Sequence, residues 1–304
     1  MSDLLRIGTR GSPLALAQAQ ETRSRLMATL ALPENVFEII VIKTTGDMVR
    51  DRPLSEIGGK GLFTKELEEA LLEGRIDLAV HSMKDMPAQM PHGLEIGAVL
   101  PREDVRDAFI SLSAKSLQTL PKGAKLGSSS VRRTAQALRL RPDLVVAPFR
   151  GNVETRLQKL NEGVANATFL AAAGLKRLGL AAHITSLISV EDMLPAVAQG
   201  AIAIQVKHDS SALTHVTKIN HAESNIAVTC ERAFMAALDG SCRTPIAGLA
   251  ILQNGDVMFR GEALTLDGTH VFTAHRTGAP ADAAKMGREA GEEVKAKGGT
   301  LIAY

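Results

Sequence analysis

One of only two cysteines in this 304-residue chain lies on a predicted turn, where its thiol could react. Cys242 follows a helical pattern that Gly240 is expected to end in the left-handed conformation, and Pro245 blocks any helical continuation. Arg243 beside it favours the nucleophilic thiolate, whereas the C-terminal end of a helix dipole disfavours it. From these residues alone, Cys242 is either a reactive nucleophile or a chance surface cysteine.

Basic and hydroxyl side chains recur directly after predicted strands. Ligands of open α/β sheets bind beyond the carboxyl ends of the strands. One arginine there is ordinary solvated surface, but a set spread over two lobes predicts a cleft that holds several carboxylates or phosphates. The serines add hydroxyls and helix N-terminal amides to the same clamp. The set comprises Arg10, Lys84, Ser128–Ser130, Arg132, Arg133, Arg150, Arg156 and Arg177.

Asp85 is the one acid that follows a short apolar strand within this basic set. A carboxylate in that place can move protons or stabilise a cation that forms on a substrate. A catalytic role would therefore rest on its position beside the cations. The alternative is an aspartate that only stabilises a turn or caps a helix.

The elements that position these residues alternate between strands and helices up to residue 206. Ser12 is a good N-cap, and Pro13 suits the first position of a helix that runs to about Leu30. The alternation predicts mostly parallel, doubly wound sheets. The expected strands are 4–8, 36–42, 76–80, 94–100, 108–112, 125–127, 144–147, 168–172 and 201–206, and the other expected helices are 64–73, 131–140, 153–163 and 175–180.

The remainder of the chain has a different pattern. Asn220, with Glu223 three residues later, predicts a capping box that opens a helix to Leu238. Cys230 falls on the apolar face of that helix and is expected in the core. Hairpin turns at Asn254-Gly255 and Asp267-Gly268 separate expected strands at 246–252, 257–261 and 270–274, before a helix at about 281–297.

These patterns predict an α/β chain with two doubly wound lobes and a small α+β C-terminal domain that carries a three-stranded antiparallel sheet. The expected domains are residues 1–99 with 200–219, residues 100–199, and residues 220–304. Crossings near residue 100 and near 195–200 predict a two-strand hinge. The long polar segment 44–61 is expected to be a mobile lid or disordered, and its glycines lack the Gly-Lys-Ser/Thr ending of a phosphate-binding loop.

Composition narrows the class of protein. A net charge of +2 and 3% aromatic residues argue against nucleic-acid binding. No apolar run is long enough to span a membrane, and the N-terminus shows no secretion signal. Two cysteines make no disulfide framework, which favours a reducing cytoplasm, and no Cys/His cluster has metal-ligand spacing. We expect a cytoplasmic monomer, because no apolar helix or exposed strand calls for a partner.

The motifs together resemble the porphobilinogen deaminase family, and the resemblance covers the chain nearly end to end. It rests on Arg10-Gly11-Ser12-Pro13-Leu14-Ala15, His81-Ser82-Met83-Lys84-Asp85-Met86-Pro87, Gly127-Ser128-Ser129-Ser130-Val131-Arg132-Arg133, Arg150-Gly151-Asn152-Val153, Ala173-Gly174-Leu175-Lys176-Arg177-Leu178 and Gly240-Ser241-Cys242-Arg243. The resemblance implies three domains, the first two like periplasmic binding proteins. It also implies a transferase that joins four porphobilinogen molecules, with loss of ammonia, into the linear tetrapyrrole hydroxymethylbilane.

The same resemblance implies a role for each motif residue. Cys242 would carry a dipyrromethane cofactor through a thioether, and Asp85 would be catalytic. The cofactor would be bound by Lys84, Ser130, Arg132, Arg133 and Arg156. The substrate would be bound by Arg10, Arg150, Arg177, Gln199, Phe63 and Ser82, with Phe63 and the 58–61 glycines resembling the family's cover over the cleft.

Two positions depart from the family pattern. Ala198 stands where the family usually has a glycine, and Gln205 stands where a glutamate is common. These departures bear on local packing near the hinge and not on the reaction. Gln199 between them would still line the cleft.

Two other functions compete with this interpretation. A non-enzymatic, two-lobed anion-binding protein would explain the arginines but neither the third domain nor a reactive cysteine. An enzyme that uses Cys242 as an ordinary nucleophile would need a histidine base, for which His81 is the nearest candidate in sequence. Its place directly after a buried strand favours a packing role instead.

Overall fold

The computed structural model describes residues 4–48, 61–240 and 244–302. Two compact units divide the chain, one within residues 1–50, 59–103 and 200–225, the other including residues 104–199 and 226–304. Most of the expected lid segment, and Cys242 itself, lie outside the described residues.

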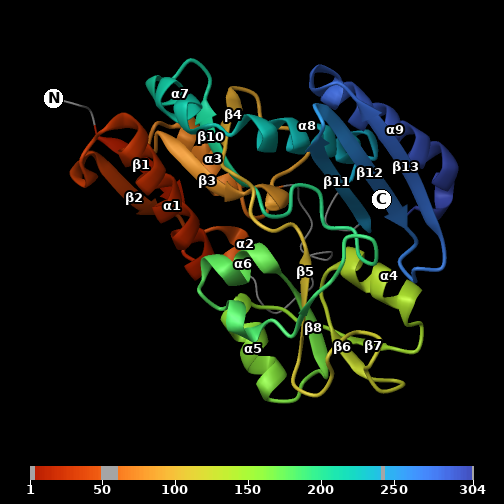
Figure 1. The fold of residues 1–304 in the computed structure, drawn as a ribbon. Coiled ribbons are helices and arrows are strands. Elements are labelled where there is room, and N and C mark those ends of the chain that lie inside the picture. The colour runs from red at the N-terminus through yellow and green to blue at the C-terminus, as the bar shows by residue number, and fades with distance from the viewer. Residues whose placement is uncertain (1–3, 49–60, 241–243, 303–304) are drawn as a thin grey trace. The chain divides into compact units, whose positions relative to one another are not determined.

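The first unit contains a five-stranded sheet in the order β2-β1-β3-β10-β4 (Figure 1). Strands β1 and β2 are parallel, as are β1 and β3, whereas β10 is antiparallel to both of its neighbours. Only β10, which follows residues 104–199 of the other unit, is antiparallel to the other strands. The strands are β1 (Leu5–Thr9), β2 (Phe37–Val41), β3 (Leu78–Ser82), β4 (Leu94–Val99) and β10 (Ile202–Lys207).

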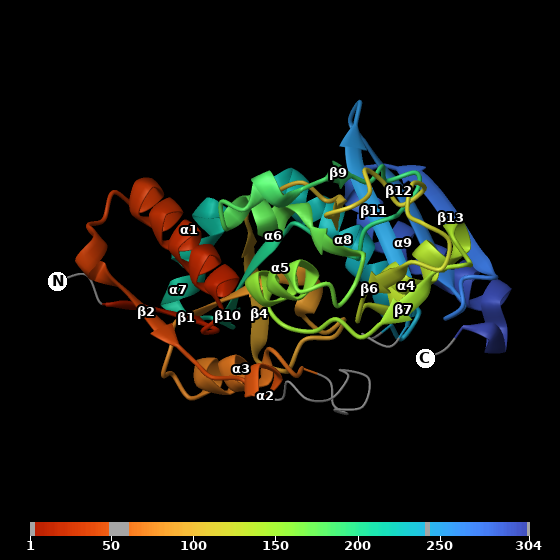
Figure 2. The ribbon, with the colours of Figure 1, turned by 90° about the horizontal axis from the view of Figure 1, so that it is seen from below.

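Helices cover both faces of this sheet. Helices α1 (Pro13–Leu30) and α7 (Ser211–Val216) pack on one face, and α3 (Lys65–Leu72) packs on the opposite face (Figure 2). Leu26 and Leu67 are fully buried in these two layers, and each such side chain contributes about 1.5–3 kcal/mol. The predicted start of α1 is confirmed, since the Ser12 hydroxyl accepts a hydrogen bond from the Ala15 amide at 3.3 Å.

The remaining elements of this unit are short. They are helix α2 (Thr45–Met48) and the 3-10 turns η1 (Glu34–Val36), η2 (Met83–Asp85) and η4 (Thr217–Ile219). Neither α2 nor α7 was expected from the sequence. Their four and six residues are too few to show a reliable helical period.

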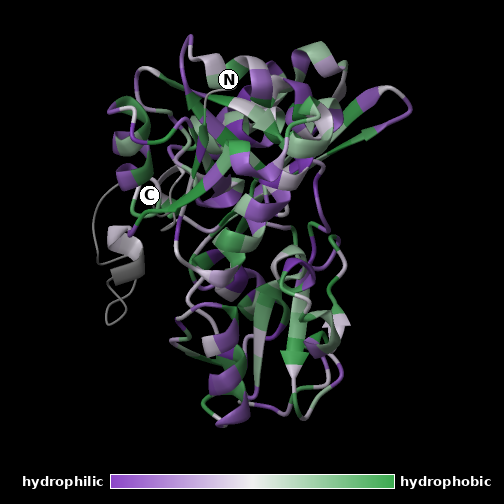
Figure 3. Ribbon diagram, turned by 90° about the vertical axis from the view of Figure 1, so that its left-hand side faces the viewer, coloured by the Kyte–Doolittle hydropathy of each residue, from purple (hydrophilic) through white to green (hydrophobic). Residues whose placement is uncertain are grey.

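The second unit repeats the arrangement with a sheet in the order β7-β6-β8-β5-β9. Again a single strand, β5, is antiparallel to both of its neighbours, β8 and β9, whereas β6 is parallel to β7 and β8. Figure 3 shows these strands as mainly hydrophobic, and α4 packs on one face while α5 and α6 pack on the other. The elements are β5 (Asp107–Ser111), β6 (Lys125–Gly127), α4 (Val131–Leu140), β7 (Val145–Ala147), α5 (Val153–Asn161), β8 (Ala167–Ala171), α6 (Ala172–Arg177), η3 (Ala181–His183) and β9 (Ser186–Leu187).

The same unit contains the antiparallel sheet β11-β12-β13. Its predicted hairpin turn at Asn254-Gly255 is confirmed, with φ angles of 54° and 88° that suit a type I′ turn. Cys230 is fully buried as expected, and burial raises the pKa of its thiol to about 12. The elements are α8 (Ala222–Ala237), β11 (Ile246–Gln253), β12 (Asp256–Leu264), β13 (Val271–Gly278), η5 (Pro280–Asp282), α9 (Ala283–Gly298) and η6 (Gly299–Leu301).

Helices α8 and α9 pack backbone against backbone through glycines. A Cβ added to Gly287 would lie 2.0 Å from the Cys230 carbonyl oxygen, and one added to Gly291 would lie 2.7 Å from the Phe234 oxygen. Both contacts are far closer than van der Waals distance. Glycine at these positions therefore sets how near the C-terminal helix lies to the helix that leads toward Cys242.

The fold-class prediction is confirmed. The residues expected to begin and end helix α8 were wrong by one position each. Asn220 does not cap the helix, because its side chain accepts a hydrogen bond from the Val99 amide at 2.9 Å. His221 takes that place, and its Nδ1 accepts from the Ser224 amide at 3.2 Å. At the other end Asp239, with a φ of 50°, takes the left-handed conformation expected of Gly240.

Ala198 adopts a strained backbone conformation in the second unit. Its φ of 59° is unusual for a residue with a Cβ, and it is buried. The buried Glu231 carboxylate accepts hydrogen bonds from the Ala198 and Ala250 amides at 2.6 and 2.8 Å, which holds this conformation in place. The structure thus gives the physical reason why a glycine is favourable at this position.

Replacing Ala198 with glycine is expected to stabilise the protein by about 0.5–1 kcal/mol. The left-handed conformation costs an L-residue roughly 1–2 kcal/mol, and the extra freedom of glycine in the unfolded chain offsets about 0.5–1 kcal/mol of the gain. Urea unfolding measures the change. Ala203→Gly, in the middle of β10, is the matched control and should destabilise; equal losses in both variants would contradict the strain argument.

Candidate active site

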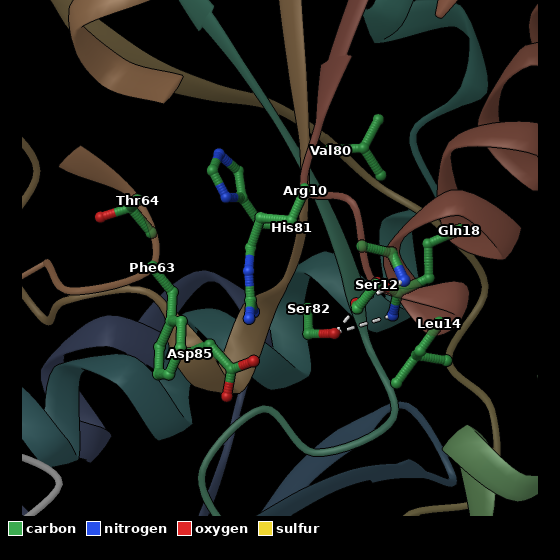
Figure 4. Close-up of a pocket in the computed structure, with 11 residues that line it drawn as sticks. Arg10, Ser12, Leu14, Gln18, Phe63, Thr64, Val80, His81, Ser82 and Asp85 are labelled. Atoms are coloured by element: carbon green, nitrogen blue, oxygen red, sulfur yellow. Dashed lines mark hydrogen bonds between the residues drawn. The ribbon is translucent and has the colours of Figure 1, made fainter. Parts of the chain in front are cut away.

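A pocket of about 60 Å³ lies in the first unit, where β1 and β3 end (Figure 4). Arg10 follows β1 directly, Ser82 ends β3, and Asp85 ends the η2 turn. Three predicted site residues are thus brought together at carboxyl ends of neighbouring parallel strands, where α/β proteins bind ligands. The pocket is lined by Arg10, Ser12, Leu14, Ala15, Gln18, Phe63, Thr64, Val80, His81, Ser82 and Asp85.

Arg10 is held against an aromatic ring inside this pocket. Its guanidinium carbon lies 4.2 Å from the centre of the Phe63 ring, a cation–π contact. Figure 4 shows the guanidinium directed toward Phe63 and the Asp85 carboxylate. The pocket therefore presents a cation and a half-buried acid together, the pair needed to bind one charge of a ligand and to stabilise another.

The position of Phe63 depends on a glycine. A Cβ added to Gly46 would lie 2.3 Å from Cε1 of the Phe63 ring, so only glycine leaves room for it. The Gly46 amide also donates a hydrogen bond to the Leu62 carbonyl at 2.9 Å, and the Thr45 amide donates to Glu66 at 2.8 Å. These contacts fix the ring beneath Arg10.

Ser82 is held from the opposite side of the pocket. The Gln18 amide nitrogen donates to the Ser82 hydroxyl at 2.9 Å (Figure 4). Gln18 is buried on α1, which packs on the sheet. Sequence reasoning missed Gln18 because only its place on the inward face of α1 distinguishes it.

His81 is buried in β3 and also lines the pocket. The Gln205 side chain lies 2.9 Å from its Nε2. Burial lowers the pKa of His81 to about 4, helped by the nearby Arg10 charge and only partly opposed by the Gln205 hydrogen bond. The imidazole is neutral at physiological pH. The prediction had placed it just after the strand, but pairing with β10 extends β3 to Ser82.

Arg132 and Arg133 lie in a buried ion cluster in the second unit. Both contact the fully buried Asp107, Arg132 at 2.8 Å and Arg133 at 2.7 Å. Gln199 joins them, since its amide donates to Asp107 at 3.1 Å and to the Val105 carbonyl at 2.7 Å. Two guanidinium groups share one carboxylate, so the cluster keeps a net positive charge of one at this end of α4.

The other residues of the second unit that were predicted to bind cofactor or substrate are less buried. Ser130 caps α4, and Arg150, Arg156 and Arg177 are half-buried. The Arg156 Nε donates to the Gly151 carbonyl at 2.9 Å. Arg150 differs, because its Nη1 is buried and finds no hydrogen-bond partner among the residues that the structure describes. Lys84, in the first unit, is half-buried on the η2 turn.

Two absences concern the described residues 4–48, 61–240 and 244–302. Within them, no three or more His, Cys, Asp or Glu side chains gather in a way that could hold a metal ion. None of their helices combines the length and the hydropathy that crossing a membrane requires.

Comparisons with known proteins bear on this site. The family model "Porphobilinogen deaminase, dipyromethane cofactor binding domain" matches residues 5–215, and the model of the C-terminal domain of porphobilinogen deaminase matches residues 225–296. A TRAP solute binding protein from a marine metagenome aligns at a TM-score of 0.44 and 12% identity, over 77% of this chain and 80% of its own.

Two curated relatives carry the same name. Porphobilinogen deaminase of Paracoccus denitrificans is 56% identical over 96% of this chain and 94% of its own length. The chloroplastic porphobilinogen deaminase of rice is 55% identical over 97% of this chain and 84% of its own length. Matches of this extent leave a single assignment: the chain belongs to the porphobilinogen deaminase family.

Proposed function

We propose that this chain makes hydroxymethylbilane by joining four porphobilinogen molecules, each with loss of ammonia, on a dipyrromethane primer attached to Cys242. The observation that carries the proposal is the pocket in which Arg10 and Asp85 lie together at the ends of β1 and β3. The family match over 5–215 and 225–296 supports the same chemistry. A non-enzymatic anion-binding protein has no support in the comparisons.

The residues of the second unit fit a cofactor that carries several carboxylates. Arg150 has a buried Nη1 with no partner among the described residues, and a carboxylate oxygen is the acceptor it lacks. The Asp107 cluster holds two guanidinium groups against one carboxylate, with the buried Glu262 also near Arg132. Cofactor carboxylates would be held by Lys84, Ser130, Arg132, Arg133 and Arg156. When bound, the dipyrromethane supplies the pyrrole to which substrate units are added.

Asp85 stabilises the positive charge that develops on the pyrrole of porphobilinogen as ammonia leaves. The carboxylate lies in a small pocket, where a fixed charge acts more strongly than in bulk water. It is also placed to hold a proton during the step. Asp85 is thus the catalytic residue of the proposal.

Arg10 binds a substrate carboxylate, with Ser82 and Phe63 completing its surroundings. The Phe63 ring limits the directions that the guanidinium can take. Arg150 and Arg177 serve as further substrate contacts as the chain grows. Gln199, which was expected to bind substrate, is fully buried and instead supports the Asp107 cluster. Porphobilinogen brings two carboxylates per unit, which accounts for many cations in a protein whose net charge is only +2.

Replacing Arg10 with leucine is expected to lower kcat/KM for porphobilinogen by roughly 10–100-fold. One charge-assisted hydrogen bond contributes about 1.5–3 kcal/mol, which corresponds to that range. Initial rates of substrate consumption measure it. Arg25→Leu, at a half-buried position of α1 that pairs with Glu21, is the control and should keep the wild-type value. An unchanged kcat/KM in Arg10→Leu would remove this residue from the substrate site.

Three further parts of the proposal concern organisation. We infer three domains: residues 1–99 with 200–219, residues 100–199 and residues 220–304. The three separate sheets support this division. The protein is proposed to act as a cytoplasmic monomer that binds neither nucleic acid nor membrane. The small number of cysteines, the near-neutral charge and the few aromatic residues support that setting.

A further inference from the structure

A line of buried polar side chains leads away from the pocket in the first unit. His81 Nε2 lies 2.9 Å from Oε1 of Gln205, and Nε2 of Gln205 donates to the Glu68 carboxylate at 3.3 Å. The three residues come from β3, β10 and α3, and all are buried. His81 also lines the pocket that holds Arg10 and Asp85. One amide therefore connects a pocket residue to an enclosed carboxyl group.

An amide in this place has two hydrogen-bonded arrangements. When Glu68 is ionised, the Gln205 N–H group donates to it and the Gln205 carbonyl accepts from His81 Nε2–H, so Nδ1 carries a lone pair. When Glu68 is protonated, its O–H donates to the carbonyl of a turned amide, whose N–H donates to Nε2. The ring proton then lies on Nδ1. The turned form has one proton more, taken up on Glu68, and the ring is neutral in both.

We propose that Gln205 is a positioning residue that couples the tautomer of His81 to the proton on Glu68. His81 lines the pocket, and its Nδ1 is then a hydrogen-bond acceptor when Glu68 is ionised and a donor when Glu68 is protonated. The consequence for catalysis rests on the function proposed for this pocket. An acceptor suits the N–H groups of the substrate's amino group, which leaves as ammonia, and a donor suits a carboxylate.

The charged groups around His81 agree with this coupling. Arg10 at the end of β1 disfavours an imidazolium, Asp85 on η2 lines the same pocket, and Glu68 approaches from α3. Burial raises the pKa of Glu68, although the hydrogen bond from Gln205 opposes the shift. Burial lowers the pKa of His81 to about 4. Glu68 therefore changes protonation at a higher pH than an exposed glutamate, while the ring stays neutral.

The test is the ¹⁵N chemical shift of the His81 ring, followed across pH in the intact holoenzyme. In the wild type the signals should change from the Nε2–H to the Nδ1–H pattern as pH falls, in a single step that coincides with the acid limb of kcat. A His81→Gln variant assigns the signals. A ring that keeps one tautomer over the whole pH range in which the holoenzyme stays folded would overturn the proposal.

Two variants of matched volume make the test specific. In Glu68→Gln only the His81 ring can still ionise, and its pKa is about 4. Above that pH the tautomer should not change, and the roughly tenfold fall of kcat per pH unit on the acid limb should be lost. Gln205→Met, which cannot hydrogen bond, should uncouple the ring from Glu68 in the same way. A wild-type tautomer change in either folded variant would contradict the coupling.

The spectroscopic result is independent of turnover. A tautomer change that follows Glu68 in a protein without porphobilinogen activity would keep the coupling and reject the proposed function. An active enzyme whose His81 tautomer does not change with pH would keep the proposed function and reject the coupling.

Discussion

Replacing Asp85 with asparagine is expected to lower kcat by about 10²–10⁴-fold, the range for loss of a positioned acid–base group. The substitution keeps the size of the side chain but removes the charge that faces the cation formed as ammonia leaves. Because Asp85 lines the pocket and lies at the end of a short turn, the fold should tolerate the change. Rates of porphobilinogen consumption and ammonia release measure the loss.

The control for this variant is Asp143→Asn, at a half-buried ion pair with Arg141 in the second unit. It should have wild-type rates, and circular dichroism and thermal unfolding should show both variants folded. An Asp85→Asn enzyme that retains more than about a third of wild-type kcat would remove Asp85 from the mechanism.

Replacing Asp107 with asparagine is expected to lower the free energy of unfolding by about 3–5 kcal/mol. Removing one member of a buried ion pair leaves uncompensated charge, and here two guanidinium groups depend on the same carboxylate. Gln199 loses an acceptor as well. Urea unfolding at neutral pH measures the effect. Asp77→Asn is the control, because its pair with Arg6 is partly exposed and should contribute less than about 1 kcal/mol.

The pH dependence of stability follows from the same cluster. Burial alone would oppose ionisation of Asp107, but the charges and hydrogen bonds of Arg132 and Arg133 outweigh it and hold its pKa well below the usual range. A lowered folded-state pKa gives stability that is fully present above the unfolded value of about 3.9 and lost as pH falls below it. The wild type should lose this contribution on acidification, and Asp107→Asn should not. A loss of less than 1 kcal/mol at neutral pH would contradict the account of the cluster.

Local sequence signals predicted the elements that depend on neighbouring residues. The bounds of β6 and α4 agree with the expected ones, because serine capping and helical periodicity are local properties. Strand β3 was misplaced by two residues, since its end is set by pairing of Ser82 with Ile202, far away in the chain. Asn220 was misassigned for the same reason, as its partner Val99 lies 121 residues away.

The residues of the candidate site also fall into those that local sequence signals predicted and those that depend on contacts with distant residues. Arg10, Phe63, Ser82 and Asp85 were predicted and line one pocket. The side chains that hold such residues were not predicted, because Gln18 and Glu68 look like ordinary positions of amphipathic helices. Asp107 is separated by 26 residues from Arg133, and no local pattern shows that they pair. Packing between distant elements decides these supporting contacts.

The covalent primer is the central claim, and intact-mass spectrometry tests it most directly. The protein as purified should be heavier than its sequence mass by two linked pyrrole units. Cys242→Ala should have the sequence mass and no activity, because the primer has no other attachment point. Cys230, buried with a pKa of about 12, is the matched position where Cys230→Ala should keep the added mass. An unmodified wild-type protein with full activity would contradict the account.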